Sequence, residues 1–315
     1  MAREPQTLMD AIRFFADPDV ALEFMVSLRW PNGVACPTCG ALEPRFIATR
    51  RMWECKEKHP RKQFSVKIGT IMEDSPIGLD KWLATIWMIA NDKNGISSYE
   101  VAKAIGVTQK SAWFMLHRIR LAMEDGTFNR ASGTVEVDET YIGGKARFMH
   151  KSKRPQVDGM VGKAAVMGFL ERAPEKGKSK VKATTIPDPK RRTIQPKIHE
   201  NIAPGSAVYT DGAGGYRYMD EAYMHAVVNH DAGEYVRESI HTNGIENFWS
   251  LLKRGIHGTY VSVEPFHLFR YLDEQVFRFN SRDLTDGDRF LVLMRSLSGK
   301  RLTYEQLISS GTTPA

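Results

Sequence analysis

The stretch that decides the fold is His241-Thr242-Asn243-Gly244-Ile245-Glu246-Asn247-Phe248-Trp249-Ser250-Leu251-Leu252-Lys253-Arg254. Its apolar side chains recur at the i, i+3, i+4 and i+7 spacing of one helix face: Ile245, Phe248, Trp249 and Leu252. Glu246 and Lys253 are seven positions apart, on one side of that helix and off the apolar stripe. The pattern predicts a helix that buries one face and presents a carboxylate and an ammonium group on another.

Glu246 has two interpretations on this helix. In the first, Asn243 is the N-cap and Glu246, three residues on, completes a capping box, which is the commoner role for such a pair. In the second, Glu246 is a catalytic carboxylate. The stretch alone favours the first interpretation, and the residues upstream shift the balance to the second.

Two upstream segments each predict a strand that carries an acid. Residues 206–212 form a short apolar run that ends in Asp211, and residues 134–144 form a β-branched run around Asp138. Three carboxylates that converge repel one another unless cations lie between them. Hard oxygen ligands suit Mg²⁺ or Mn²⁺, and paired ions of this kind drive in-line attack on phosphodiesters. We therefore expect a metal site to which residues 134–144, residues 206–212 and the helix at Glu246 each contribute one acid.

The composition excludes a membrane-spanning chain and a secreted disulfide framework. The 315 residues are 42% hydrophobic, enough for one good core and one or two smaller modules. No run of eighteen apolar residues occurs and the N-terminus has no signal-peptide pattern, so we expect a soluble, cytosolic protein. The net charge of +7 is consistent with a nucleic-acid partner, although many ordinary proteins are equally basic.

All three cysteines lie within twenty positions of one another. The pattern is Cys36-x₂-Cys39, a gap of 15 residues, and then Cys55-x₃-His59. Thiolates and an imidazole at this spacing predict a tetrahedral zinc site in a ribbon. The alternative is three buried thiols and a surface histidine. His59 is the weakest of the four ligands, because many ribbons carry a cysteine at this position and Lys58 occupies the C-x₂-C spacing.

Helices flank the predicted ribbon. Residues 6–30 read as helical with a break at residues 17–19, residues 64–72 alternate like a strand that closes the ribbon, and residues 79–90 form an apolar helix. A helix that starts at residue 97 or 98, a turn at residues 106–108 and a helix over residues 109–123 match a helix-turn-helix, with any small helical bundle as the alternative. From it we expect DNA contacts by Gln109, Lys110, Ser111 and Arg118.

The pattern changes to strands after residue 133. We expect strands at residues 164–170, 181–186 and 224–228 beside the two acidic ones, and a helix at residues 194–201. The order strand, strand, strand, helix, strand is that of the ribonuclease H-like core. Residues 145–200 hold 15 Lys and Arg against 5 Asp and Glu. From this basic region and the end of the helix at Glu246 we expect phosphate contacts by Lys145, Lys151, Lys153, Arg154 and Arg254.

Beyond the helix at Glu246 the chain predicts a glycine-rich basic turn and more helices. The turn covers residues 254–260, and an aromatic-rich helix follows at residues 266–280. Core packing is the favoured role for its aromatic stripe, ahead of base stacking. Residues 286–308 predict two short helices that close the core or contact a partner protomer.

Several motifs together resemble the bacterial insertion-sequence transposases of the DDE class that carry an N-terminal zinc ribbon. The resemblance runs from about residue 20 to residue 282. The motifs are Cys36-Pro37-Thr38-Cys39-Gly40, Gln63-Phe64-Ser65-Val66 with Gly69-Thr70-Ile71-Met72, Val137-Asp138-Glu139-Thr140-Tyr141-Ile142-Gly143-Gly144-Lys145, Tyr209-Thr210-Asp211-Gly212, and His241-Thr242-Asn243 with Ile245-Glu246, Phe248-Trp249-Ser250 and Lys253-Arg254.

The resemblance implies a multidomain α+β chain. It comprises an N-terminal helical segment (1–30), a zinc ribbon (31–74), a helix-turn-helix (75–128), an α/β ribonuclease H-like DDE domain (129–282) and a C-terminal helical tail (283–315). It implies one structural Zn²⁺, two Mg²⁺ or Mn²⁺ per active site, and double-stranded DNA as the partner, both as terminal inverted repeats and as target. We expect a homodimer or higher oligomer on DNA, in the bacterial cytoplasm with the nucleoid.

The resemblance also implies roles for residues. Asp138, Asp211 and Glu246 are the metal ligands, and Lys253 holds a DNA phosphate while water and then a 3′-OH attack the DNA. Asn243 or Asn247 is an alternative third ligand. Because Glu136 and Glu139 flank Asp138, the first ligand is less well defined than the second. The roles of His230, His241 and His257 stay open. Two competing functions remain, a DNA-binding regulator with an inactive DDE scaffold and a nuclease without strand transfer.

Overall fold

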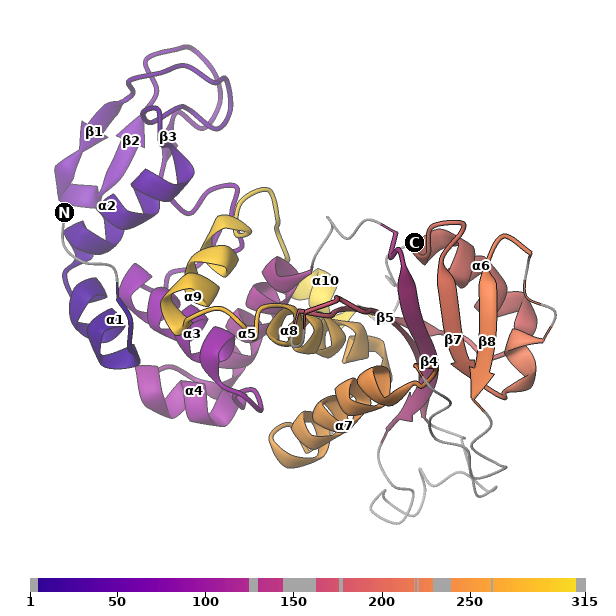
Figure 1. Cartoon of the computed structure of the whole chain (residues 1–315). Helices are drawn as coiled ribbons and strands as arrows, with labels where there is room; N and C mark the ends of the chain where they lie inside the picture. The colour runs from indigo at the N-terminus through magenta and orange to yellow at the C-terminus, as the bar shows by residue number, and fades with distance from the viewer. Residues whose placement is uncertain are drawn as a thin grey trace. The chain divides into compact units, whose positions relative to one another are not determined.

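The structure is a computed structural model that describes residues 5–124, 130–143, 163–175, 178–217, 219, 221–228, 239–261 and 263–309. The chain divides into two compact units (Figure 1): residues 1–123 with 284–315, and residues 124–283. None of the helices among the described residues is long and apolar enough to cross a membrane. The fold class is mixed α+β, with a small ribbon-like sheet in the first unit and a larger sheet in the second.

The first unit begins with two helices and the small sheet. The helices are α1 (Leu8–Phe15) and α2 (Pro18–Arg29), and the predicted break between them is confirmed, because Asp17 caps α2 and Pro18 occupies its first position. The sheet is antiparallel, in the order β1 (Arg45–Ile47), β2 (Met52–Glu54) and β3 (Gln63–Phe64). Trp53 packs between Trp30 and Phe64, with ring centroids 5.5 and 6.1 Å away.

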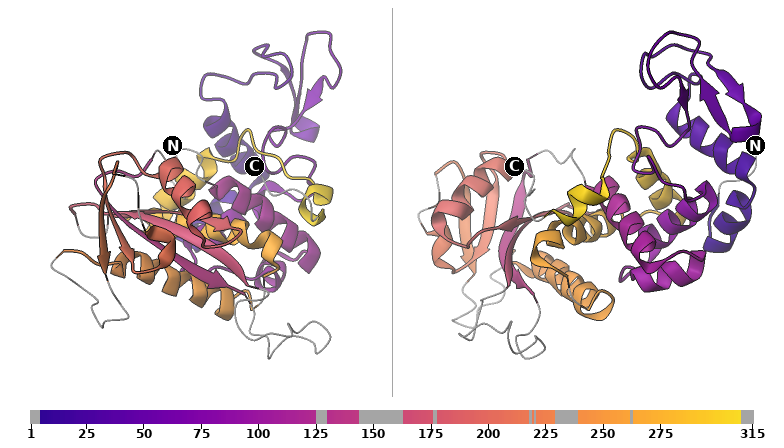
Figure 2. Two further views of the ribbon diagram at one scale, coloured as in Figure 1. Left: turned by 90° about the vertical axis from the view of Figure 1, so that its right-hand side faces the viewer. Right: turned by 180° about the vertical axis from the view of Figure 1, so that it is seen from behind.

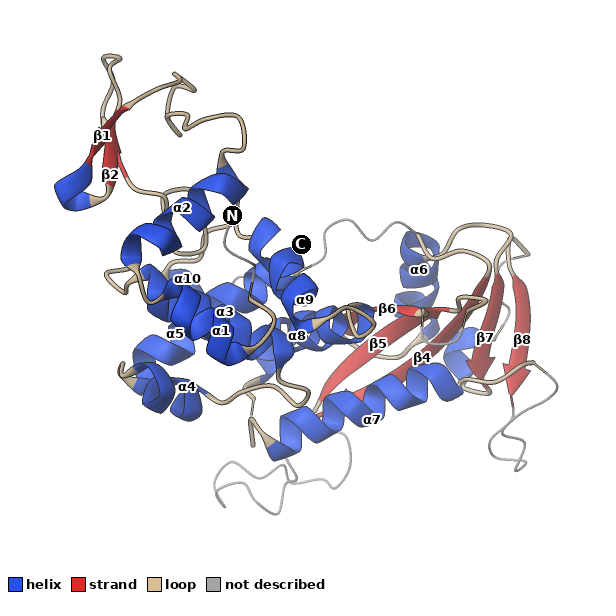
Figure 3. Cartoon of the chain, turned by 60° about the vertical axis from the view of Figure 1, so that its left-hand side comes forward, coloured by secondary structure: helices blue, strands red, loops and turns tan. Residues whose placement is uncertain are grey.

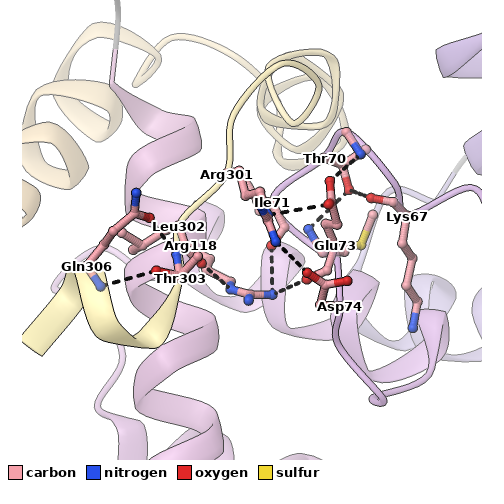
Figure 4. Close-up of polar contacts among 12 residues, drawn as sticks. Lys67, Thr70, Ile71, Glu73, Asp74, Arg118, Arg301, Leu302, Thr303 and Gln306 are labelled. Carbon is pink, nitrogen blue, oxygen red and sulfur yellow. Dashed lines mark hydrogen bonds and ion pairs between the residues drawn. The ribbon is translucent and has the colours of Figure 1, made fainter. Parts of the chain in front are cut away.

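The predicted strand over residues 64–72 is wrong beyond its first residue. β3 ends at Phe64, and turns follow in which Gly69 has a φ of 73°. Side chains and a short backbone bridge satisfy the backbone here: the Glu73 carboxylate accepts from the Gly69 N–H at 2.7 Å, and the Ile71 N–H donates to the Leu297 carbonyl at 3.1 Å. Arg118 donates to the carbonyls of Ile71, Glu73 and Leu302 at 3.2, 2.9 and 3.1 Å (Figure 4).

Those contacts argue against the expectation that Arg118 binds DNA. Its side chain is only 7% exposed, its guanidinium stacks on Phe114 at 4.1 Å, and its Nε and one terminal nitrogen donate to backbone carbonyls. A phosphate would have to displace those bonds in a buried site, so Arg118 serves the fold of the unit.

Helices form the rest of the first unit: α3 (Leu79–Asn91), α4 (Ser98–Ile105), α5 (Gln109–Met123), α9 (Asp286–Arg295) and α10 (Tyr304–Ile308). Ser97 caps α4 in a capping box with Glu100, and Gly106 ends it at a φ of 63°. The two short C-terminal helices are confirmed, and α9 packs on α3 through Phe290, whose ring lies 5.0 Å from Trp87. They therefore close the core of this unit.

The second unit contains a five-stranded sheet in the order β6-β5-β4-β7-β8. The strands are β4 (Thr134–Ile142), β5 (Ala164–Glu171), β6 (Lys180–Ile186), β7 (Ala207–Asp211) and β8 (Met224–Val228), with α6 (Arg191–Asn201) before β7. β4, β5 and β6 pair antiparallel, whereas β4–β7 and β7–β8 pair parallel. The predicted strands and helix are confirmed in order and place.

Helices cover both faces of this sheet (Figures 2 and 3). Alternate residues of β4 separate two cores: Ile142 packs with α7 (Asn243–Gly258) and α8 (Leu268–Asn280), while Val135 and Val137 pack on the side of α6. Side chains at even positions of β4 therefore face α7, and those at odd positions face α6.

The predicted turn at residues 254–260 is wrong over residues 254–258. α7 continues to Gly258, because Gly255 and Ile256 are buried and Ile256 joins the core against the sheet. That burial outweighs the low helix propensity of glycine. The aromatic-rich helix is confirmed as α8, and its rings at Tyr271 and Phe279 pack in the same core, as expected.

Candidate active site

The three predicted acids come from three elements of the second unit. Asp138 lies in the middle of β4, Asp211 is the last residue of β7, and Glu246 lies in the first turn of α7. β4 and β7 are adjacent and parallel, with Glu136 opposite Tyr209. The same register continued by two residues on both strands would place Asp138 beside Asp211, at the end of β7.

The electrostatics of Asp138 show that the acids face a common region. Burial is the largest cause that raises the pKa of Asp138, to about 6, and the negative charge of Asp211 raises it further. Glu246 acts in the same direction with a smaller effect. Charges act on one another in this way when they share a partly desolvated region, so Asp211 and Glu246 face the same region as Asp138.

Each acid also has a hydrogen-bond donor of its own. Trp249 Nε1 donates to Asp138 Oδ2 at 2.9 Å, and the Ala213 N–H donates to Asp211 Oδ1 at 3.0 Å. Glu246 is exposed and accepts from the Thr242 hydroxyl at 2.7 Å. The donors hold the three carboxylates in defined orientations and leave each with lone pairs for a further partner.

The capping interpretation of Glu246 is wrong as predicted. α7 begins at Asn243 and its N-cap is Thr242, whose side chain does not accept a hydrogen bond from the first turn of the helix. Glu246 is therefore one position too far along for a capping box. A carboxylate from β4 takes the capping role instead, because Glu136 Oε2 accepts from the Ile245 N–H at 2.9 Å.

The two acids beside Asp138 are distinguished by their partners. Glu136 is 1% exposed and pairs with Arg172 at 2.6 Å. Glu139 points to the other face, where it accepts from the Tyr216 hydroxyl at 2.5 Å. Burial is the main cause that raises its pKa to about 8; the Tyr216 bond opposes this, and the charges of Asp138 and Asp211 reinforce it. Glu136 is therefore committed to Arg172, while Glu139 lies on the opposite face of β4 and still feels the charges of Asp138 and Asp211.

Gly168 explains how Trp249 reaches Asp138. It lies opposite Asp138 in the β4–β5 register, and a Cβ there would lie 2.6 Å from the Trp249 ring and 2.8 Å from Ile245. Only glycine leaves room for the indole to cross the strand at this point.

The basic residues of α7 lie on its solvent-exposed face. Lys253, Arg254 and His257 are exposed, and within the described ranges no carboxylate lies at ion-pair distance from Lys253. Asn243 and Asn247, the alternative ligands, are exposed as well. The predicted phosphate-binding residues Lys145, Lys151, Lys153 and Arg154 lie outside the described residues, as does His230.

An open pocket adjoins Asp211 beyond the end of β7. It is lined by Asp211, Gly212, Ala213, Tyr216, Arg217, His225 and Val227. His225 Nε2 lies 2.9 Å from the Thr210 hydroxyl, and burial lowers the pKa of this histidine. A neutral imidazole and an exposed guanidinium therefore border the space next to the second acid.

The ribbon ligands in the first unit are gathered at one point. The donor atoms of Cys36, Cys39, Cys55 and His59 all lie within 4.8 Å of one another. His59 Nε2 lies 3.4 Å from the Cys36 sulfur, while Nδ1 lies 2.7 Å from the Pro60 carbonyl, which leaves Nε2 to the metal. A tetrahedron with Zn–S bonds of about 2.3 Å needs ligand atoms roughly 4 Å apart, so the residues fit Zn²⁺.

The three acids Asp138, Asp211 and Glu246 differ from the ribbon ligands in the atoms that they offer to a metal. Among the described residues, the ribbon residues are the one group of three or more such side chains close enough to hold an ion. Asp138, Asp211 and Glu246 do not form such a group, although the charges of Asp211 and Glu246 raise the pKa of Asp138. Their donor set is all oxygen, which fits Mg²⁺ or Mn²⁺ in chemistry.

The start of α5 carries three of the predicted DNA contacts. Gln109 donates to the Ser98 hydroxyl at 2.8 Å, and the Lys110 ammonium lies 4.6 Å from the centroid of the Tyr304 ring. The Thr108 hydroxyl caps the helix by accepting from the Ser111 N–H at 3.1 Å. Of the three, Lys110 is exposed, and the other two are half-buried.

Three residues of the site have no signal in the sequence. Trp249 reads only as part of the apolar stripe, Arg172 as one charge in a basic loop, and Tyr216 as an aromatic after a glycine pair. Each reaches its acid across the sheet, over sequence separations of 111, 36 and 77 residues. Local periodicity cannot reveal contacts of that range.

Comparisons with known proteins agree on one class. A family model described as an ISXO2-like transposase domain matches residues 130–280, and one described as a transposase zinc-ribbon domain matches residues 17–59. The chain is 24% identical over 256 residues to a protein in transposable element ISH50 of Halobacterium salinarum, covering 78% of this chain and 85% of that protein. It is 32% identical over 108 residues to a transposase-like protein of Haemophilus influenzae, covering 34% and 86%.

Proposed function

The chain belongs to the ISXO2-like insertion-sequence transposases with an N-terminal zinc ribbon, and from that premise we propose that it cuts DNA at the ends of its element and joins them to target DNA. Membership implies a nucleotidyl-transfer enzyme that binds DNA. The finer proposal is a DDE transposase that recognises terminal inverted repeats and performs cleavage and strand transfer at Asp138, Asp211 and Glu246.

The raised pKa of Asp138 carries this proposal. Next to burial, its cause is the charge of Asp211 and then of Glu246, so the three acids that the family pattern selects are also neighbours. A scaffold without catalysis would gain nothing from acids that destabilise one another. A site that binds cations recovers that cost when the cations arrive.

The sheet supports a ribonuclease H-like domain. Its order β6-β5-β4-β7-β8, with three antiparallel strands followed by two parallel ones, places the first and fourth strands side by side at its centre. Those are the strands that carry Asp138 and Asp211.

Asp138, Asp211 and Glu246 would hold two Mg²⁺ or Mn²⁺ ions, which supply an activated nucleophile and stabilise both the attacking and the leaving oxygen of the phosphodiester. Trp249 keeps Asp138 oriented through its indole N–H. Lys253 and Arg254, exposed along α7, would hold DNA phosphates near the scissile bond.

The first unit would recognise the DNA ends. The ribbon and the α4–turn–α5 pair, whose second helix presents Lys110 beside Gln109 and Ser111, support a helix-turn-helix role. Because two element ends are joined in one event, we propose that at least two copies assemble on DNA.

A strand-transfer assay tests the proposal. Zinc-loaded protein, Mg²⁺ or Mn²⁺, labelled element-end DNA and a plasmid target are incubated together, in parallel with Asp211→Ala and Glu246→Ala proteins. We expect metal-dependent joined products from the unaltered protein and none from either variant.

Other outcomes select other functions. Cleavage without joining would favour a nuclease, and DNA binding without either reaction would favour a regulator with an inactive scaffold. Activity that survives Glu246→Ala alone would move the third ligand to Asn243 or Asn247.

A further inference from the structure

We propose that Glu136 and Arg172 are positioning residues that seat the first turn of α7 on the sheet and thereby set where Glu246 lies relative to Asp138. The inference rests on the proposed function for its catalytic consequence. We call the contacts of Glu136 and Arg172 with the start of α7 the seat, and these contacts are formed among described residues. In this arrangement Glu136 is an anchor for the helix, although it lies two residues from Asp138 on the same face of β4.

Both oxygens of Glu136 are committed within the protein. Oε1 accepts from Arg172 Nε at 2.6 Å, and Oε2 accepts from the Ile245 N–H at 2.9 Å. Ile245 is the third residue of α7, so its N–H has no partner within the helix. The carboxylate satisfies that donor, and its charge is favoured by the helix dipole. It is 1% exposed and therefore needs both partners.

Arg172 extends the seat to the segment that leads into α7. Its guanidinium donates to the carbonyls of Ser239 and His241, each at 2.7 Å, and lies 2.6 Å from His241 Nδ1. It also lies over the Tyr209 ring, 5.0 Å from its centroid. One side chain thus joins the end of β5, strand β7, the segment before α7 and, through Glu136, strand β4.

Two glycines let α7 approach the sheet this closely. A Cβ on Gly244 would lie 2.9 and 3.0 Å from the two Glu136 oxygens and 3.0 Å from Leu170. A Cβ on Gly168 would overlap the Trp249 ring, as described above. The helix is therefore fitted to the sheet at two successive turns, at Glu136 and at Asp138.

The seat fixes the active-site spacing because its residues alternate with the proposed ligands. Glu136 holds Ile245, and the next residue along the helix is Glu246; Trp249, one turn later, holds Asp138. A shift of the first turn away from β4 would carry Glu246 with it. Glu136 and Arg172 thus position the proposed ligands of α7 and β4 without being proposed ligands themselves.

Hydrogen exchange and manganese dependence test the seat together. The variants are Glu136→Gln, which keeps an oxygen acceptor and removes the charge, Arg172→Met, and Gly244→Ala. The matched control is Glu274→Gln, because Glu274 in α8 is equally buried (0% exposed) and pairs with Arg278. Exchange is followed in peptides covering residues 241–250 of zinc-loaded protein without added Mg²⁺ or Mn²⁺, and cleavage is titrated with Mn²⁺.

We expect exchange in the first turn of α7 to rise about tenfold or more in the three variants. Glu136→Gln and Arg172→Met weaken or remove buried polar contacts, and Gly244→Ala adds a methyl group that pushes the helix away from the Glu136 carboxylate. The Mn²⁺ concentration for half-maximal cleavage rises by a similar factor, with a smaller loss of the rate at saturating Mn²⁺. Arg172→Lys recovers part of both effects. Glu274→Gln leaves both measurements at the unaltered level even where it lowers the melting temperature.

Wild-type exchange and an unchanged Mn²⁺ midpoint in Glu136→Gln and Arg172→Met would overturn the inference. Equal increases in the Glu274→Gln control would also overturn it, because they would mark a general loss of stability. An unaltered protein that neither cleaves nor joins DNA would defeat the proposed function instead, and the exchange measurement would still decide whether the seat exists.

Discussion

The two polar clusters of this chain are built in different ways. The ribbon gathers Cys36, Cys39, Cys55 and His59 within 24 consecutive positions, and their donor atoms lie within 4.8 Å of one another. The acidic cluster takes Asp138, Asp211 and Glu246 from two strands and a helix over more than a hundred positions, and each acid has its own hydrogen-bond donor. In structural metal sites the protein supplies all the ligands, whereas catalytic sites keep a position open for substrate, and under the proposed function the acidic cluster would be a site of the second kind.

The two sites also depend on different parts of the structure. Turns of the local chain close the ribbon, with an aromatic cluster around Trp53 beneath it. The acidic cluster depends on sheet register and on the seating of α7, both of which belong to the core of the second unit. Changes at one site should therefore leave the other intact, and the following predictions test that independence.

Loss of a zinc ligand should have the largest effect. In Cys55→Ser protein, or after chelation, we expect zinc to be lost and the ribbon to unfold, because structural zinc contributes roughly 10 kcal/mol or more to folding in such modules. Atomic absorption should fall below one zinc per chain, and Trp53 fluorescence should shift. Thr38→Ser, in the same turn, is the control. Full zinc occupancy in Cys55→Ser protein would show that this cysteine is not a ligand.

Removal of the first acid should abolish catalysis and spare the ribbon. We expect Asp138→Asn to lower DNA cleavage about a thousandfold or more, since the metal contribution amounts to several kcal/mol and each 1.4 kcal/mol is about tenfold. A gel assay with labelled DNA measures the loss, and zinc content should stay at that of the unaltered protein. A parallel loss of zinc would contradict the independence of the two sites.

A methyl group at Gly168 should act on the acidic site through Trp249. We expect Gly168→Ala to destabilise the second unit by about 1–3 kcal/mol, because the new Cβ overlaps the indole that holds Asp138. Urea denaturation measures this, and DNA cleavage should fall with it. Gly258→Ala, where a Cβ meets no atom within 4 Å, is the control. Equal effects at the two glycines would remove the case for the Trp249 contact.

The smallest predicted effect is on pH dependence. The pKa of Asp138 is raised from 3.8 to about 6 in the folded protein, so folding binds its proton more tightly. This contribution to stability is complete below pH 4 and is lost as the pH rises through 6. Without added Mg²⁺, the free energy of unfolding of Asp138→Asn protein, relative to that of the unaltered protein, should therefore rise between pH 5 and pH 8.

We expect that gain to be on the order of 1–2 kcal/mol, reduced from the full value because Asp138 is partly exposed. Urea denaturation at the two pH values measures it. Excess Mg²⁺ at pH 8 should narrow the difference by stabilising only the protein that keeps its ligand. If the stability difference between the two proteins is the same at both pH values, the pKa of Asp138 is not raised in the folded protein.

Sequence patterns predicted most of the elements and failed where the tertiary structure decides. Strands β4 to β8 and the C-terminal helices follow from periodicity. Residues 64–72 alternate like a strand, yet they form turns whose backbone groups bond to Glu73, Arg118 and the backbone of Leu297. α7 passes through Gly255, because Ile256 is buried against the sheet. Alternation and glycine content describe local preference, and contacts from distant residues override it.

The sequence by itself determined the ribbon ligands, the three candidate acids and the apolar face of α7. The ribbon ligands and the apolar face depend on spacing within one segment, which is a property of the linear chain. The acids come from three separate segments, and the resemblance to the family selected them. Only the tertiary structure decided that Glu136 and Arg172 hold α7, that Trp249 holds Asp138, and that Arg118 is buried. These are contacts across 36 residues or more, formed when strands pair and a helix packs on their face.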